Sequence, residues 1–301
     1  MKVTVTGATG LIGSRLLAAL AARGDEVRVL SRDPEGARER LGVDAISWDP
    51  ESEPAPAAAL SSADAVVHLA GEPVAQRWRD EVKARIRRSR EVGTANLVAG
   101  LSAADPRPRV LASSSGTGFY GARGDERVDE SSAPGRDFLA QVCVGWESAA
   151  DAAAELGVRV VKVRTGVVLD SSGGALKTML APFRLGVGGP VAGGGQYLPW
   201  IHVDDIVGIY LAALDGAEWH GPVNASAPEP VTNREFSRAL GRALHRPALL
   251  PVPELALRAL YGEMAEMVTQ GQRAVPGRAL ELGYHFRHPD LDEALRSALG
   301  E

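Results

Sequence analysis

The chain has 301 residues, of which 45% are hydrophobic and 24% are charged, and its formal net charge is −5. This is the composition of an ordinary globular protein, and a mildly acidic chain argues against nucleic acid or an anionic membrane as a partner. The apolar stretch 16–22 is far too short to span a bilayer. The single cysteine, Cys143, excludes an internal disulfide and fits a reducing compartment, so we expect a cytoplasmic protein.

Short β-like runs alternate with helical stretches over the first 165 residues, beginning with a predicted helix at Leu11–Ala22. Strands are predicted at Lys2–Thr6, Glu26–Leu30, Ala45–Trp48, Ala65–Leu69, Arg109–Ser113 and Arg159–Arg164. Because strands separated by helices pair in parallel through right-handed crossovers, this pattern predicts an α/β fold with a Rossmann-type doubly wound parallel sheet.

The pattern changes after residue 166, where glycine and proline become frequent. Helices are predicted at Leu176–Arg184, Arg234–Leu244 (opened by the capping box Thr232–Glu235), Leu255–Tyr261 and Asp290–Leu299. We expect residues 1–165, with returning segments near 200–226, to form a nucleotide-binding domain. Residues 166–301 then form a smaller α/β substrate-side domain with a C-terminal helical tail.

A turn with glycine at every third position separates the first strand from the first helix. Gly7 permits the tight turn, Gly10 lets backbone N–H groups approach a pyrophosphate, and Gly13 lets the helix pack closely on the strand. The start of the helix adds unpaired N–H donors and partial positive charge. The predicted cofactor contacts are Gly7, Thr9, Gly10, Leu11, Ile12 and Gly13, with Leu69, Ala70, Gly71 and Glu72 after the fourth strand.

The end of the second strand predicts which dinucleotide is bound. An NAD site usually places a carboxylate about 20 residues beyond the glycines, where it holds the ribose 2′-hydroxyl. This chain has Ser31 and Arg32 there, and a guanidinium holds a 2′-phosphate bidentately. We therefore expect NADP(H) in preference to NAD(H). The alternative is that Arg32 is a solvated surface charge and that Asp33 serves NAD.

These motifs resemble those of the extended short-chain dehydrogenase/reductase superfamily. The matching strings are Thr6–Gly13, His68–Gly71, Gly93–Leu97, Ser113–Ser115 with Tyr120-Gly121, and Trp200–Asp205. Over nearly its whole length the chain is similar to the YfcH-type epimerase family of atypical members, through Leu69–Pro73, Arg164–Leu169, Pro182–Gly186 and Gly271–Pro276. The resemblance implies an oxidoreductase or epimerase that acts on a small carbonyl or a nucleotide-sugar-like substrate.

The sequence departs from the superfamily at its acid–base pair, a tyrosine followed four residues later by a lysine. Counting back from Glu147, these positions hold Leu139 and Cys143. No tyrosine lies between residues 120 and 197, and no lysine lies between residues 83 and 162. Because a nearby ammonium is what makes tyrosine useful near neutral pH, the resemblance implies an NADP-binding protein whose proton-transfer group is unusual or missing.

Tyr120 and Ser115 are the candidate replacements, since both follow the carboxyl end of the fifth strand, where ligands bind in such sheets. The resemblance assigns polarisation of the substrate carbonyl to a hydroxyl here, and Thr117 is an alternative to Ser115. Tyr120 has a second interpretation, in which its ring only lines the pocket.

Other side chains have both a chemical and a structural interpretation. Cys143 is either a nucleophile or a small buried apolar group. Glu72 and Arg164 lie after strand ends and are candidates for ligand contact. His202 is either a general base or a brace for a helix that starts near Ile206 and is capped by Asp204 or Asp205. The six histidines lack metal-ligand spacing, so no metal is expected.

Two functions stay open at this point. The first is an NADP(H)-dependent oxidoreductase or epimerase with a small-molecule substrate. The second is a non-catalytic NADP(H)-binding protein with a regulatory or partner-binding role, which the missing Tyr/Lys pair favours. The oligomer is expected to be a monomer or a homodimer.

Overall fold

The computed structural model describes residues 1–301 and has a seven-stranded parallel sheet at its centre. The strand order is β11-β7-β5-β4-β1-β2-β3. These strands are β1 (Lys2–Thr6), β2 (Glu26–Ser31), β3 (Asp44–Ser47), β4 (Ala65–His68), β5 (Val110–Gly116), β7 (Arg159–Thr165) and β11 (Gly221–Ala225). The predicted doubly wound α/β fold is confirmed, and all six predicted strands lie in the sheet. The seventh, β11, comes from the returning segment near 200–226 and pairs with β7.

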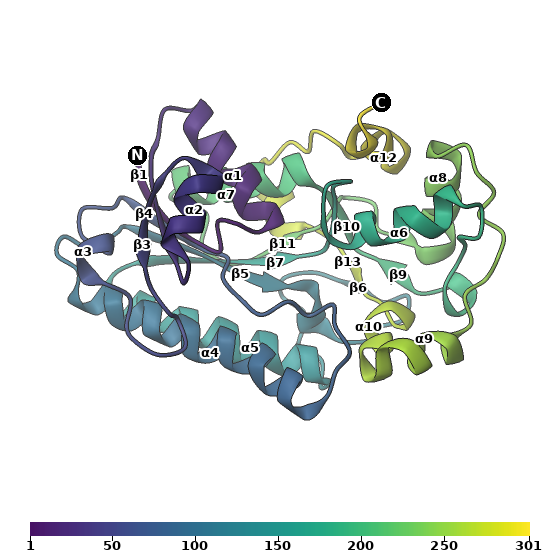
Figure 1. Cartoon of the computed structure of the whole chain (residues 1–301), viewed down its shortest axis with the longest axis horizontal. Helices are drawn as coiled ribbons and strands as arrows, with labels where there is room; N and C mark the ends of the chain where they lie inside the picture. Colours follow the sequence, from purple (N-terminus) through teal and green to yellow (C-terminus); the bar gives the residue numbers. More distant parts are fainter.

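Helices cover both faces of the sheet (Figure 1). One face carries α1 (Leu11–Ala22), α2 (Pro34–Leu41) and α7 (Val203–Asp215), and the other carries α3 (Ala57–Leu60), α4 (Asp80–Ala103) and α5 (Phe138–Asp151). Alternate residues of β4 enter the two cores: Ala65 and Val67 pack with the α1 and α7 side chains, and Val66 packs with those of α4. Burial of both faces explains why the strands are almost continuously apolar.

The remaining elements form a smaller part of the molecule, which has a separate core and also adds Ile201 and Ala279 to the core of the sheet. It contains β8 (Val167–Leu169) paired with β10 (Trp200–His202), β9 (Tyr197–Leu198) with β12 (Val231–Thr232), and β13 (Arg273–Ala274) with β6 (Arg127–Val128). Its helices are α6 (Gly174–Arg184), α8 (Asn233–Ala243), α9 (Glu254–Tyr261), α10 (Glu266–Thr269), α11 (Gly277–Glu281) and α12 (Leu291–Leu299). Single 3₁₀ segments lie at Thr117–Tyr120, Ala152–Leu156, Ala192–Gly194 and Gly262–Ala265.

Helices α6, α8 and α12 pack together around Leu180, Phe236 and Leu295 in a core separate from those of the sheet. This separate core supports the predicted division into two domains, which stays a prediction. The predicted capping box is confirmed, because Thr232 and Glu235 each bond the backbone N–H of the other at the start of α8. Among the helices of the chain, none combines the length and apolar character needed to cross a membrane.

Candidate functional site

The glycine turn between β1 and α1 leaves no room for side chains at two of its three glycines. Gly7 has φ +68°, and a Cβ there would lie 2.6 Å from the carbonyl carbon of Leu69. A Cβ on Gly13 would lie 2.5 Å from the carbonyl oxygen of Gly7. Gly10 is the N-cap of α1, and no side chain caps the N–H groups of the first turn of the helix, so these donors are open to a ligand.

The predicted contacts after β4 lie directly against this turn. The N–H of Leu69 bonds the carbonyl oxygen of Thr6 at 3.1 Å, and the N–H of Ala70 bonds the Thr6 hydroxyl at 3.2 Å. Helix α4 then holds the next residues: the N–H of Glu72 donates to the Ser89 hydroxyl at 2.9 Å, and Arg90 donates to the Glu72 carbonyl at 2.9 Å. The structure therefore brings both predicted glycine-containing segments to the carboxyl edge of the sheet.

Arg32 and Asp33, which follow β2, have different surroundings in the structure. The carboxylate of Asp33 accepts the N–H of Gly36 at 3.0 Å and thereby caps α2. Ser31 also bonds this turn, since its hydroxyl accepts the N–H of Asp33 at 3.1 Å. Arg32 is exposed and makes no hydrogen bond or ion pair through its side chain. The Arg32 guanidinium is therefore free to bind a ligand, whereas the Asp33 carboxylate already caps α2.

Side chains at the ends of β5 and β7 belong to a buried polar network, which contains Ser115, Tyr120, Glu147, Arg164 and Asn224. Arg164 donates two hydrogen bonds to the Glu147 carboxylate, from Nε to Oε1 at 2.8 Å and from Nη2 to Oε2 at 2.9 Å. The Ser115 hydroxyl donates to the same Oε1 at 2.8 Å. Arg164 also donates to the Tyr120 hydroxyl at 3.0 Å, and that hydroxyl donates to Oδ1 of Asn224 at 2.7 Å. All five side chains belong to residues that are at most 6% exposed.

Burial favours the protonated forms of two groups at this network, the Tyr120 hydroxyl and the Cys143 thiol. Burial raises the pKa of the Tyr120 hydroxyl to about 12, although the Arg164 cation works against the rise. Burial also raises the pKa of Cys143 to about 11, and the Glu147 carboxylate adds to this effect. At neutral pH Tyr120 therefore keeps its proton, and Cys143 is a neutral thiol without the thiolate that a nucleophile needs.

His202 caps α7, in line with its predicted role as a brace for this turn, whereas the predicted start and capping residue of the helix were wrong. The helix begins at Val203 rather than near Ile206, and Nδ1 of His202 accepts the N–H of Asp204 at 3.1 Å. The Asp205 side chain faces away from the cap and accepts the backbone N–H groups of Arg287 and His288 at 2.7 and 3.0 Å. The cap was mispredicted because aspartate is the commoner N-cap residue and no local signal shows that Asp205 binds a distant segment.

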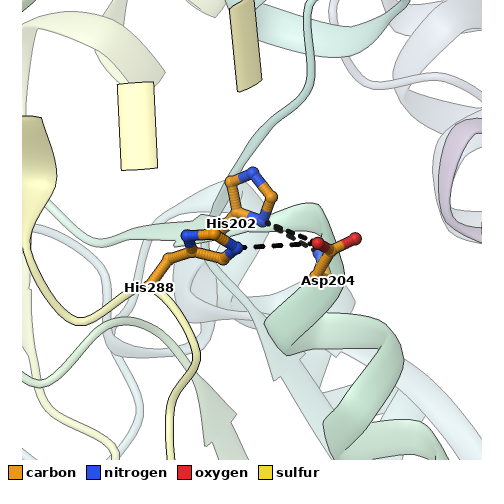
Figure 2. A group of neighbouring side chains, drawn as sticks. All are labelled: His202, Asp204 and His288. Carbon is orange, nitrogen blue, oxygen red and sulfur yellow. Dashed lines mark hydrogen bonds and ion pairs between the residues drawn. The ribbon is translucent and has the colours of Figure 1, made fainter. Parts of the chain in front are cut away.

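His202, Asp204 and His288 form a small cluster that the sequence did not indicate, because His288 is remote along the chain (Figure 2). The Asp204 Oδ2 atom is 3.8 Å from His202 Nδ1 and 3.6 Å from His288 Nε2, and the two imidazole centroids are 3.8 Å apart. These three side chains are close enough together to hold a metal ion; Nδ1 of His202 accepts the N–H of Asp204, whereas its Nε2 is buried without a hydrogen-bond partner.

Sequence reasoning missed two members of the buried network. Nothing in the sequence around Glu147 or Asn224 indicates a partner, because each meets Arg164 or Tyr120 only through the tertiary fold. A signal was present in the strand itself: Arg164 follows Val163 in a strand whose neighbours are apolar and buried. A charge at such a position requires a buried counter-charge.

Two family models match the chain. One, described as "NAD dependent epimerase/dehydratase family", covers residues 3–224, and the other, "Domain of unknown function (DUF1731)", covers residues 252–298. The first model ends within β11 of the central sheet, and the second begins after α8.

Curated relatives and solved structures agree with these matches. The epimerase family protein SDR39U1 homolog, chloroplastic, of Arabidopsis thaliana is 41% identical over 304 residues, covering 99% of this chain and 87% of the relative. The crystal structure of human epimerase family protein SDR39U1 (isoform 2) with NADPH has a TM-score of 0.89 at 37% identity over 100% of both chains. UDP-glucuronic acid 4-epimerase from Bacillus cereus, at 19% identity and a TM-score of 0.81, shares the fold.

The predicted resemblance to epimerase-type short-chain dehydrogenases/reductases is confirmed, whereas the narrower YfcH-type grouping stays a prediction. The compartment also stays a prediction, since the name of the Arabidopsis relative places that protein in the chloroplast. The family model and the structural similarity to human SDR39U1 both include the central sheet and its glycine turn. The chain belongs to the NAD dependent epimerase/dehydratase family.

Proposed function

We propose that the protein binds NADP(H) and transfers a hydride between this cofactor and a small carbonyl or nucleotide-sugar-like substrate, as an oxidoreductase or epimerase. The observation that carries the proposal is the first turn of α1, whose N–H groups receive no side-chain cap and which follows Gly7, packed against Leu69 and Ala70. Such a turn binds a pyrophosphate through backbone donors and the helix dipole. NADPH in the human relative supports the same ligand for this chain.

Arg32 is the residue we propose to select NADP(H) over NAD(H). Its guanidinium has no protein partner, and Asp33 is occupied by capping α2. A charge-assisted contact with the 2′-phosphate contributes about 1.5–3 kcal/mol, so Arg32→Gln should weaken NADPH binding about tenfold or more and leave NADH binding unchanged. Isothermal titration with each dinucleotide measures both effects.

Arg40→Gln is the matched control for this comparison. Arg40 is exposed on α2 and makes no ion pair, so it shares the net charge change of Arg32→Gln without its position at the end of β2. Equal affinities of the unaltered protein for NADPH and NADH would contradict the role of Arg32 and favour an NAD site served by Asp33.

For proton transfer we propose a relay through Ser115 and Glu147. In the oxidation direction the substrate hydroxyl gives its proton to Ser115 Oγ, while the serine proton moves to the Glu147 carboxylate 2.8 Å away. Arg164 holds that carboxylate in place with two bonds. The cofactor, when bound, supplies or accepts the hydride. Tyr120 is left out of the relay, because its hydroxyl is bonded to Asn224 and Arg164 and its pKa is raised to about 12.

A screen of carbonyl compounds and sugar nucleotides that follows NADPH absorbance tests this relay. Ser115→Ala should lower kcat by about 10²–10⁴, the usual effect of losing a positioned acid–base group. Tyr120→Phe should keep kcat within a few-fold. The opposite ranking would return the proton transfer to Tyr120.

One observation favours the second function, a non-catalytic NADP(H)-binding protein. Ser115 is 4% exposed and Tyr120 is fully buried, so neither hydroxyl lies open at the surface of the protein. Dinucleotide binding without turnover of any compound in the screen would favour this regulatory or partner-binding alternative.

A further inference from the structure

A loop of the substrate-side part lies against the first turn of α1. This loop, Asp170–Gly173, follows β8 and continues into Gly174, the first residue of α6. Both glycines touch the first residue of α1: a Cβ on Gly173 would lie 3.1 Å from Cδ1 of Leu11, and one on Gly174 would lie 3.1 Å from Cδ2. Leu11 directly follows Gly10, the residue at which we place the pyrophosphate. The loop therefore packs against the turn that is proposed to hold the cofactor.

An ion pair between Arg15 and Asp170 also links the loop to α1. Nε and Nη2 of Arg15, one turn further along α1, each lie 2.9 Å from Oδ2 of Asp170. The other carboxylate oxygen of Asp170 accepts the N–H of Ser172 at 2.7 Å and so fixes the conformation of the loop itself. The Asp170 side chain is 3% exposed, whereas that of Arg15 is 51% exposed.

The charge state of Asp170 agrees with this fastening. Burial alone would raise the pKa of its carboxyl, but the bonds from Ser172 and the Arg15 cation outweigh burial and lower it. Asp170 is thus ionised at neutral pH, and Arg15 is the cation that neutralises it. A buried carboxylate that loses its cation is expected to move toward solvent or take up a proton, and either change loosens the loop.

We propose that Arg15 and Asp170 are positioning residues for the dinucleotide, acting through the loop that packs on Leu11. By holding the loop on the first turn of α1, the pair keeps that turn in its binding conformation before the ligand arrives. Binding then does not have to order the turn, which is the general advantage of a preorganised site. The pair also links the substrate-side part to the cofactor site, so that dinucleotide binding and the position of α6 are coupled. This inference rests on the proposed dinucleotide binding.

Arg15→Gln, Asp170→Asn and the double variant test the proposal by isothermal titration with NADPH and by thermal unfolding without it. Each single variant should raise the Kd for NADPH about five- to tenfold, the lower range of typical coupling between sites. The double variant should bind no more weakly than the weaker single variant, because both changes break the same contact. Arg15→Gln alters an exposed side chain, so it remains informative if Asp170→Asn fails to fold.

The matched control is Arg242→Gln, which breaks the ion pair between α8 and Asp292 at 2.7 Å, remote from α1 (Figure 1). Its Kd for NADPH should equal that of the unaltered protein. A lower melting temperature with unchanged Kd in the Arg15 and Asp170 variants would show a merely structural pair and overturn the inference alone. Failure of the unaltered protein to bind NADPH, NADP⁺, NADH or NAD⁺ would overturn the proposed function and this inference together.

Discussion

Gly10→Val should abolish NADPH binding and leave the protein folded. Gly10 has φ −76° and ψ 175°, an extended conformation that any residue adopts, and a Cβ there would lie 3.3 Å from the Gly7 carbonyl oxygen. The fold therefore accepts a side chain at this position with a small shift. The two methyl groups of valine would, however, occupy the space in front of the first turn of α1, where we place the pyrophosphate. Titration should show no binding, while denaturation should show a loss of about 1 kcal/mol, typical of a poor N-cap residue.

Gly10 is the glycine of this turn at which a loss of binding can be separated from a loss of structure. Substitutions at Gly7 or Gly13 would place a Cβ within 2.6 Å of backbone atoms, so a loss of binding there would only report a broken turn. Ala18→Val is the control, because Ala18 is exposed on the same helix, beyond its first turn. NADPH binding by Gly10→Val with an unaltered Kd would show that the glycine turn has a structural role only.

Glu147→Gln should destabilise the protein by about 3–5 kcal/mol, the usual cost of leaving one member of a buried ion pair without its partner. Glutamine keeps the shape of Glu147 but removes the charge that Arg164 contacts at 2.8 and 2.9 Å. Arg164 is 3% exposed and stacks on the ring of Phe119, with 3.4 Å between Cζ and the ring centroid, so water does not replace the carboxylate. The melting temperature should fall on the order of 10 °C for a chain of this size.

Two further variants separate the ion pair from a general packing defect. Glu147→Gln combined with Arg164→Met should be less destabilised than the sum of the single variants, because the double variant leaves no unpaired charge. Asp44→Asn removes an exposed ion pair with Arg28 and should cost less than about 1 kcal/mol. Equal small losses at Glu147 and Asp44 would mean that the network contributes little to stability.

Local sequence patterns predicted most of the sheet because parallel strands buried on both faces carry a near-continuous apolar signal. Strand ends moved by a few residues: the fifth strand, predicted to end at Ser113, continues to Gly116. The strand β11 was harder to predict, because Gly221 and Pro222 weaken its strand pattern and its position in the sheet depends on pairing with β7. Pairing of this kind is a tertiary property.

The candidate site also has a part that local sequence predicts and a part that only tertiary contacts determine. The glycine turn was predictable, because three glycines, a strand and a helix are consecutive in the chain. The roles of Tyr120 and Ser115 were not predictable, because their hydroxyl partners, Asn224 and Glu147, are 104 and 32 residues away. The same holds for Arg15, whose partner Asp170 is 155 residues away.

By itself, the sequence determined the parallel α/β sheet and the glycine turn at its edge, because each depends on residue type and short spacing; it also shows no tyrosine between residues 120 and 197 and no lysine between residues 83 and 162. The tertiary structure decided which side chains are free. It engages Asp33 in a cap and leaves Arg32 open, it buries Tyr120 between Asn224 and Arg164, and it places the segment that joins β8 to α6 on α1. The physical reason is that hydrogen bonds and ion pairs between distant residues form only when the packed sheet brings them together.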